Sequence, residues 1–327
     1  MRDTFISELC NLAEADSRIM LLTGDLGFRV LDEYRHRFPA QFLNVGVAEQ
    51  NMINVAFGMA LEGRIVLAYS IANFASLKCV EQIRNGPCYH NANVKIICIG
   101  AGLSYGQLGV SHHATEDIAV MRALPDITIF SPGDDEEARE CTRALIYTPG
   151  AGYIRLEREG ADLSGTRRES FELGIPRVLM EGKDLTIIST GSMSAVALEA
   201  ARILNAGGLS VKVLQCHTLK PLKSERVLEA AAECDAVFTM EEHSVEGGLG
   251  GIIAEILLEQ GRAPSLFYRF GIRGGFTSIV GDQKYLRSEY GLDAESIATE
   301  IRMRLGKVRT IKVRGGKKAS SGQAIIR

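Results

Sequence analysis

Short apolar runs alternate with longer stretches of helical periodicity along the first half of the chain. β-branched and leucine-rich runs predict strands, and apolar residues that recur every three or four positions predict helices. The predicted strands are Ile19–Thr23, Gln41–Val45, Arg64–Tyr69, Val94–Ile99, Ile127–Phe130 and Tyr153–Leu156. The predicted helices are Met1–Ala15, Ala48–Leu61, Phe74–Arg84 and Asp134–Tyr147. This alternation predicts a mainly parallel sheet that is covered by helices on both faces.

The second half of the chain repeats the alternating pattern on a smaller scale. Its predicted strands are Leu185–Ser189, Ser210–Leu214, Ala236–Met240 and Leu266–Phe270. Its predicted helices are Ser192–Ala206, Ser224–Ala232 and Leu249–Gln260. We therefore expect an α/β chain with two doubly wound domains, at residues 1–160 and 184–306. Residues 161–183 are polar, dotted with glycine and without a clear period, which is typical of a linker.

Composition narrows the class of protein. The chain has 327 residues, of which 46% are hydrophobic, so each domain can bury a core. A net charge of −3 gives no electrostatic reason to expect binding to nucleic acid or membranes. No apolar run is long enough to cross a bilayer, and no signal-peptide pattern is evident. The seven cysteines are scattered without a C-x-x-C pair, which indicates reduced thiols and a cytoplasmic protein.

The end of the chain has a different composition. Residues 307–327 contain seven basic residues and no acidic ones. Such a segment can bind anionic surfaces, but a solvated and mobile terminus is the more common outcome. We therefore expect a basic tail outside the second domain.

Glu49 is the first candidate for chemistry. It opens a helix directly after a short apolar strand and Gly46. An acidic residue at a helix N-terminus is favoured by the helix dipole, so this position has a purely structural explanation. However, the helix that follows is apolar on nearly every side, which predicts burial of its first turn. A buried carboxylate needs a partner and is suited to exchanging a proton with a nitrogen atom of a ligand.

Two further loops follow predicted strands, at the edge where parallel sheets bind ligands. The first carries Phe74, which could contact an aromatic ring or simply belong to the core. The second, at residues 100–117, contains four glycines, His112 and His113. Adjacent histidines diverge and make poor joint metal ligands, so no metal site is predicted here. One of the two histidines could act as a general acid/base or donate to a substrate, and the alternative is a surface histidine at a helix start.

The order of the motifs resembles the C-terminal part of transketolase over about residues 1–305. This part comprises the pyrimidine-binding domain and the C-terminal domain of thiamine-diphosphate enzymes. The motifs are Gly-Val-Ala-Glu-Gln-Asn at 46–51, Tyr-Ser-Ile-Ala-Asn-Phe at 69–74, Ser-His-His-Ala-Thr-Glu-Asp at 111–117 and Glu-Glu-His-Ser-Val-Glu-Gly-Gly at 241–248. Single motifs are not specific, whereas the ordered series is.

The resemblance implies roles for particular residues. Glu49 matches the glutamate that contacts N1′ of the cofactor's pyrimidine and promotes its imino tautomer. Phe74 matches an aromatic residue that stacks on the pyrimidine, and Asp25 matches an acidic residue close to the cofactor. His112 matches a histidine that hydrogen-bonds the substrate near its reacting carbons. Arg158 resembles an arginine that binds a phosphate of the substrate.

Several positions depart from the transketolase pattern. Leu108 stands where transketolases carry an aspartate that recognises a hydroxyl of the donor. Arg29 stands near a phosphate-binding serine of the family, so both residues are candidates for substrate binding. Ile71 occupies the place of a second aromatic residue of the pyrimidine pocket. These departures point away from ordinary sugar-phosphate donors and leave the cofactor chemistry intact.

The Gly-Asp-Gly motif that holds Mg²⁺ and the diphosphate in the family is absent from this sequence. The resemblance therefore implies that a separate subunit supplies the metal ligands, with an expected α2β2 assembly. The expected activity is a transketolase-like transfer of a two-carbon unit from a ketose or 2-oxo acid to an aldehyde or ketone. The alternatives are an E1β-like or deoxyxylulose-phosphate-synthase-like enzyme that starts from pyruvate, and a non-catalytic scaffold subunit.

Overall fold

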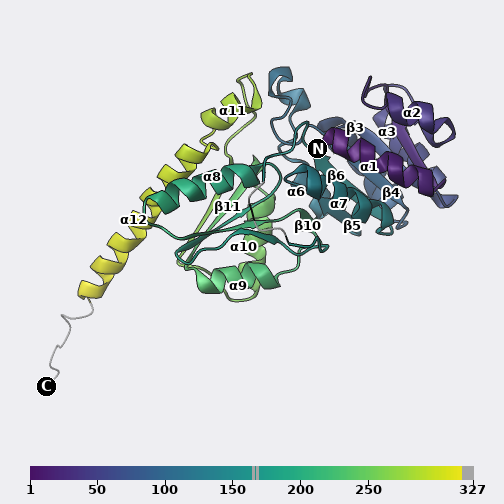
Figure 1. Cartoon of the computed structure of the whole chain (residues 1–327). Helices are drawn as coiled ribbons and strands as arrows, with labels where there is room; N and C mark the ends of the chain where they lie inside the picture. Colours follow the sequence, from purple (N-terminus) through teal and green to yellow (C-terminus); the bar gives the residue numbers. More distant parts are fainter. Residues whose placement is uncertain (164–165, 167–168, 319–327) are drawn as a thin grey trace.

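The computed structural model describes residues 1–163, 166 and 169–318. It contains two α/β domains that lie side by side, each built around its own sheet (Figure 1). The α/β class with two domains, predicted from the alternating pattern, is confirmed.

The first sheet has seven strands in the order β10-β5-β6-β4-β3-β1-β2. All neighbouring pairs are parallel except β10 with β5, which is antiparallel. β10 comes from the second half of the chain and extends the sheet at one edge. The strands are β1 (Ile19–Thr23), β2 (Phe42–Asn44), β3 (Ile65–Ile71), β4 (Val94–Ile99), β5 (Ile127–Phe130), β6 (Ala151–Leu156) and β10 (Thr218–Lys220).

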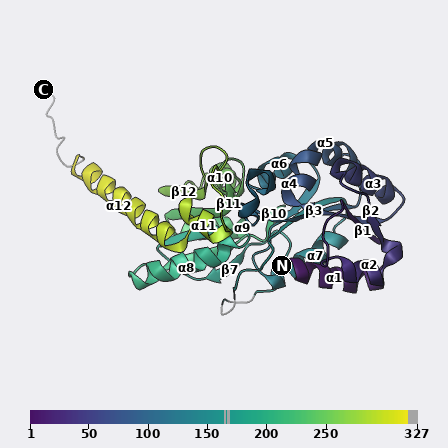
Figure 2. The ribbon, with the colours of Figure 1, turned by 90° about the horizontal axis from the view of Figure 1, so that it is seen from above.

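Helices cover both faces of this sheet, as the parallel topology requires. On one face lie α1 (Arg2–Ala15), α2 (Asp32–Arg37) and α7 (Asp135–Tyr147) (Figure 2). The opposite face carries α3 (Glu49–Leu61), α4 (Ala72–Ala75), α5 (Val80–Ile83) and α6 (Asp117–Ala123). The buried apolar cluster beneath α3 continues into the second domain through Leu249 and Ile253. The two domains therefore share part of a core.

The second sheet has five strands in the order β12-β11-β8-β9-β7. The edge strand β7 runs antiparallel to β9, and the other pairs are parallel. The strands are β7 (Arg177–Met180), β8 (Leu185–Ser189), β9 (Val211–Gln215), β11 (Ala236–Ser244) and β12 (Leu266–Ile272). The helices are α8 (Met193–Ala206), α9 (Glu225–Glu233), α10 (Leu249–Glu259), α11 (Gln283–Glu289) and α12 (Ala294–Lys318). α8 and α12 pack together on one side, and α9 and α10 on the other (Figure 1).

Several elements differ from the sequence-based expectations. β7 falls inside the stretch assigned to the linker, where its pairing with β9 overrides the weak local pattern. α12 continues to Lys318, so the expected tail from residue 307 begins within this helix, and residues 319–327 lie outside the described residues. The helix expected at Phe74–Arg84 is broken into α4, a 3₁₀ turn, α5 and a π-helical turn with Pro87 inside.

α3 was expected to be buried on nearly every side, and this is wrong for the isolated chain. Its buried residues are Glu49, Met52, Ile53 and Ala56, whereas Leu61 at its end is exposed. One face packs on the sheet and the other is open. Among the described residues, no helix is both long enough and apolar enough to cross a membrane.

Candidate functional site

The candidate residues gather at the carboxyl ends of five adjacent strands. The strands β6, β4, β3, β1 and β2 are neighbours in this order, and a loop follows each of them except β3, which leads directly into α4. Loops at this edge of a parallel sheet meet in space, so residues far apart in sequence can form one site. Phe74 was expected on a loop after its strand, but it lies in α4, which follows β3 directly.

Glu49 is buried, with only 3% of its side chain exposed. Nζ of Lys78 lies 2.6 Å from Oε2 of Glu49, while the Lys78 side chain is 50% exposed. The hydrogen bond to Glu49 raises the pKa of Lys78. Gly24 lies against the same side chain, because a Cβ atom there would stand 3.7 Å from Cγ of Glu49. The carboxylate is therefore buried in the chain and paired with a cation that faces solvent.

Sequence analysis did not single out Lys78. It lies just beyond α4, which carries Phe74, on the 3₁₀ turn Leu77–Cys79 that interrupts the expected helix. A lone basic residue four positions after Phe74 was the signal available in the sequence. The break in the helix is what brings its side chain to Glu49.

Asp25 lies next to this corner in a left-handed backbone conformation, with φ of 59°. Its backbone N–H donates to Oδ1 of Asn44 at 3.0 Å, and Nδ2 of Asn44 donates back to Oδ1 of Asp25 at 3.0 Å. These bonds tie the end of β1 to the end of β2. Asp25 is exposed and stands beside the loop that carries Glu49.

Phe74 and His112 are brought together, as a shared site requires. Their ring centroids are 5.1 Å apart in an edge-on arrangement, and both side chains are half-buried. Nδ2 of Asn73 donates to the carbonyl of Ser111 at 2.7 Å, which joins the two loops. Nδ1 of His112 lies 3.0 Å from the Ser111 hydroxyl. His113, in contrast, is buried and lines a different hollow, together with Thr115 and Ser244.

Leu108 and Arg158 line one hollow of about 540 Å³ at the junction of the two domains. Tyr105 and Lys284 also line it, so residues from both domains form its walls. Arg158 is exposed there and is available to an anionic group. The structure therefore brings together two of the expected substrate-binding residues.

The positions of Ile71 and Arg29 say less about their roles. Ile71 is half-buried at the end of β3, immediately before α4 with Phe74. Arg29 is exposed in the loop after β1, with φ of 67°. In the part of the chain that the structure describes, no hydrogen bond or ion pair joins Arg29 to the other candidate residues.

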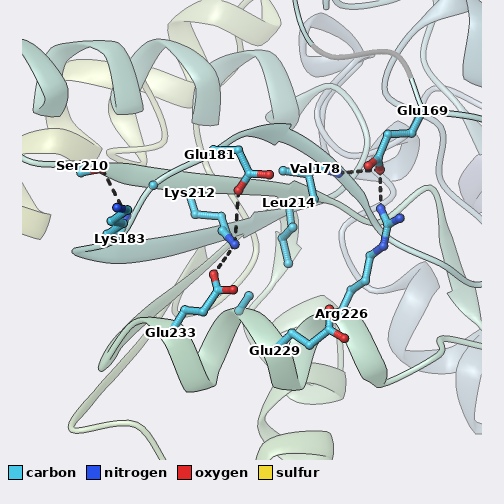
Figure 3. Close-up of a pocket in the computed structure, with 12 residues that line it drawn as sticks. Glu169, Val178, Glu181, Lys183, Ser210, Lys212, Leu214, Arg226, Glu229 and Glu233 are labelled. Atoms are coloured by element: carbon cyan, nitrogen blue, oxygen red, sulfur yellow. Dashed lines mark hydrogen bonds and ion pairs between the residues drawn. The ribbon is translucent and has the colours of Figure 1, made fainter.

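A separate hollow lies between β7, β9 and α9 of the second domain (Figure 3). It measures about 810 Å³ and is lined by charged side chains of both signs. Lys212 lies between Glu233 and Glu181, 3.4 Å from the latter, and Arg226 pairs with Glu169. Two of the cations that line the hollow, Lys212 and Arg226, are therefore already matched by carboxylates.

Known proteins resemble both halves of this chain. Residues 1–161 match the transketolase pyrimidine binding domain, and residues 175–297 match the transketolase C-terminal domain. A transketolase C-terminal section from Methanocaldococcus jannaschii is 38% identical over 92% of this chain and 95% of that protein. The chain belongs to the transketolase family. Its relatives include the 6-deoxy-6-sulfo-D-fructose transketolase subunit SqwH of Clostridium sp. (strain MSTE9), which is 37% identical over 91% of this chain and 92% of that protein.

Two further comparisons bear on this transketolase-family chain. A solved structure of a split gene transketolase, described as an inactive beta4 tetramer, matches with a TM-score of 0.84 and 36% identity. That match covers 92% of this chain and 97% of the other. The 1-deoxy-D-xylulose-5-phosphate synthase 1 of Geobacter sulfurreducens is 31% identical, but this chain spans only 46% of it. The chain thus has the length of separately encoded transketolase subunits.

The site fits one end of the cofactor that this family generally uses, thiamine diphosphate. The buried carboxylate of Glu49 is suited to a ring nitrogen, and the half-buried ring of Phe74 to an aromatic face. Among residues 1–163, 166 and 169–318, no group of three or more His, Cys, Asp or Glu side chains is arranged to hold a metal ion.

Proposed function

We propose that this chain is the pyrimidine-binding subunit of a split, thiamine-diphosphate-dependent transketolase-like transferase. The enzyme moves a two-carbon ketol or acyl unit from a ketose or 2-oxo acid donor to an aldehyde or ketone acceptor. The observation that carries the proposal is the buried carboxylate of Glu49, which is paired with the half-exposed Lys78 at the same edge of the sheet as the Phe74–His112 ring pair. Thiamine diphosphate, when bound, supplies the electron sink that stabilises the transferred carbon unit.

Each residue of the site has a defined task in this proposal. Glu49 holds or accepts a proton at the N1′ position of the pyrimidine, because its carboxylate is buried and already paired with a cation. Phe74 provides an aromatic face, and His112, held edge-on against it, donates a hydrogen bond to the substrate. Arg158 binds an anionic group in the interdomain hollow, where Leu108 replaces a polar contact with an apolar one.

The surroundings of Glu49 favour the presence of a second chain. Phe28 and Val47 flank the loops that carry Asp25 and Glu49, and their side chains are 75% and 76% exposed. Large exposed apolar side chains at a site edge are typical of an interface. We expect a separate diphosphate-binding subunit to cover them, to supply the Mg²⁺ ligands, and to form an α2β2 assembly with this chain.

The expected compartment is the reducing cytoplasm. All seven cysteines are unpaired and buried. Burial raises the pKa of the Cys79 thiol to about 12 and that of Cys88 to about 11, so both are protonated at neutral pH. Such thiols are poor nucleophiles, and their role here is packing.

Two alternative functions are distinguished by experiment. A deoxyxylulose-phosphate-synthase-like or E1β-like reaction would begin from pyruvate, and the 31% identity to the Geobacter protein keeps this option in view. A scaffold without catalytic activity is the second alternative. The buried and ion-paired Glu49 argues against a scaffold, because a carboxylate without function at that place costs stability.

The deciding experiment measures turnover of this chain with and without its partner chain. Thiamine diphosphate, Mg²⁺ and a panel of ketose phosphates, free ketoses, a sulfonated ketose and pyruvate are supplied. We expect activity only when both chains are present, with a ketose preferred over pyruvate. Preference for pyruvate supports the first alternative, and cofactor that fails to bind the assembled pair supports the scaffold.

Glu49→Gln tests the central residue. We expect a loss of about 100-fold to 10,000-fold in turnover, because the amide cannot exchange the proton. The matched control is Glu62→Gln, the same change at the exposed end of α3. Size-exclusion chromatography should show that both variants assemble with the partner. Wild-type activity in Glu49→Gln would rule out the proposed role.

A further inference from the structure

The loop that presents His112 and Leu108 is a closed excursion from the first domain. Gly102 and Ala114 pair at its neck, with the Gly102 N–H donating at 3.0 Å and the Ala114 N–H donating back at 2.9 Å. The segment 103–113 between them makes short 3₁₀ turns at 106–108 and 110–112. The neck fixes where this loop begins and ends, and contacts further along it must fix its direction.

The second domain holds the start of this loop. The side chain of Leu103 is buried in the apolar cluster of the second domain, together with Leu286. The backbone N–H of Leu103 donates to Oε1 of Glu242, on β11, at 2.5 Å. A Cβ atom on Gly102 would stand 2.4 Å from the same oxygen, so the approach requires glycine there.

Glu242 is also fixed by α11. Nε2 of Gln283 donates to Oε1 of Glu242 at 2.8 Å and lies 3.3 Å from the Ser104 hydroxyl. The guanidinium of Arg287 pairs with the other oxygen of Glu242. The Glu242 side chain is 4% exposed, and its bond to the Leu103 N–H is buried, whereas the bonds from Gln283 and Arg287 are partly buried. Charge-assisted bonds of this kind are strong and directional.

The same helix supports the loop further along. Gly106 packs so tightly that an added Cβ atom would stand 2.4 Å from Cδ1 of Leu286. Two residues later comes Leu108, which lines the interdomain hollow. The first domain supports the far end, where Nδ2 of Asn73 bonds the Ser111 carbonyl. The second domain thus holds the start of the loop, and the first domain holds its far end.

We propose that Glu242 is a positioning residue for segment 103–113, the loop that carries Leu108 and His112. Through the Leu103 N–H and the Gln283 amide, it fixes the direction in which segment 103–113 leaves the neck. This sets the places of Leu108 and His112 relative to the donor substrate. The second domain then has a task in substrate selection without contributing a side chain to the reacting atoms. The effect on catalysis rests on the proposed function, whereas the holding of the loop does not.

The first test is hydrogen–deuterium exchange of the full chain alone, which needs neither partner nor substrate. In Glu242→Ala we expect the amides of segment 103–113 to exchange about tenfold faster or more, because a buried bond to a charged group is lost. Glu242→Gln keeps an oxygen for the Leu103 N–H and should restore part of the protection. The matched control is Glu241→Gln on the same strand, whose carboxylate accepts from Leu249 and Gly250 instead. It should leave exchange of segment 103–113 unchanged.

A second variant covers the case in which Glu242→Ala does not fold. Gln283→Leu removes the donors to Glu242 and Ser104 from a half-buried place on α11, and should accelerate exchange of segment 103–113 about threefold. Unchanged exchange of this segment in whichever of the two variants folds overturns the proposal.

The second test uses the enzyme assembled with its partner chain. We expect Glu242→Ala to raise KM for the donor about tenfold while the Kd for thiamine diphosphate changes less than about twofold. Faster exchange with an unchanged donor KM overturns the positioning role. If the wild-type pair has no transferase activity at all, the proposed function fails, while the exchange result still decides whether Glu242 holds the loop.

Discussion

Two carboxylate–cation pairs in the first domain have opposite surroundings. Asp117 and Arg155 are both buried, and their bidentate contact joins Nε to Oδ2 at 2.9 Å and Nη2 to Oδ1 at 3.2 Å. The Tyr153 hydroxyl also donates to Asp117 at 2.6 Å. In the other pair only Glu49 is buried, because half of its partner Lys78 faces solvent.

The difference shows which pair can be opened by a ligand. Separating Asp117 from Arg155 would leave two unpaired charges in a dry interior. A ligand therefore cannot replace either member of this pair without a large cost in free energy. Lys78 can swing into water at little cost, since its ammonium is already half solvated. A buried carboxylate with a releasable counter-ion is suited to a site in which another donor, such as a ring nitrogen, takes the cation's place.

Removing the partner in the closed pair should have the largest effect on stability. Asp117→Asn leaves the Arg155 guanidinium buried without a counter-ion, so we expect a loss of about 3–5 kcal/mol in the free energy of unfolding. Glu49→Gln leaves only the half-solvated Lys78, and the loss should stay below about 1 kcal/mol. Urea unfolding of both variants measures the two values. Equal losses would contradict the distinction between the pairs.

The strand–turn–helix geometry around Glu49 could be predicted from sequence because it is local. The apolar run at residues 41–45, Gly46 and the periodic stretch after residue 48 lie within one short segment. Burial of Glu49 was predicted from a helix that is apolar on nearly every side; Glu49 is buried, although that premise is wrong for the isolated chain. The pairing with Lys78 could not be predicted, because Lys78 lies 29 residues after Glu49 in the sequence. It also lies on a 3₁₀ turn that interrupts the helix expected there.

The contacts between the domains were also beyond sequence analysis. Glu242 reaches the Leu103 N–H across 139 residues, and β10 joins the first sheet from the second half of the chain. Neither contact produces a periodic pattern in the sequence, because each depends on how the two folded domains pack together. The glycine-rich loop at 100–109 was visible in the sequence, but the residues that pack against it were not.

Lys95 on β4 sharpens the comparison, because it is a buried cation whose bonds go to carbonyl oxygens. Its Nζ donates to the carbonyls of Thr148 and Gly150, each at 2.6 Å. Burial lowers the pKa of Lys95 from 10.5 to about 7. An arginine side chain cannot become neutral in this way, because it keeps its proton. The buried Arg155 therefore requires the negative charge of Asp117.

The lowered pKa of Lys95 has a consequence for stability. Between pH 7 and 10.5 the unfolded chain holds the proton that the folded chain has lost. The free energy of unfolding therefore rises with pH, by at most about 1.4 kcal/mol per pH unit. Lys95→Met should lose this slope, and unfolding of both proteins between pH 7 and 8.5 measures it. Parallel curves would show that Lys95 keeps its proton in the fold.

The smallest effect is expected at Lys78. Lys78→Met leaves the buried Glu49 carboxylate without its cation, and we expect the free energy of unfolding to fall by only about 1 kcal/mol, because water can reach the carboxylate along the path that the half-exposed Lys78 side chain fills. The coupling energy from a double-mutant cycle with Glu49→Gln should be equally small and should fall as salt is raised. The same cycle with Asp117→Asn and Arg155→Met should give several times that value and respond little to salt, since its members are shielded from ions. A strong, salt-independent coupling between Glu49 and Lys78 would mean that this pair is as closed as the other, and that no ligand could replace Lys78 without a large cost.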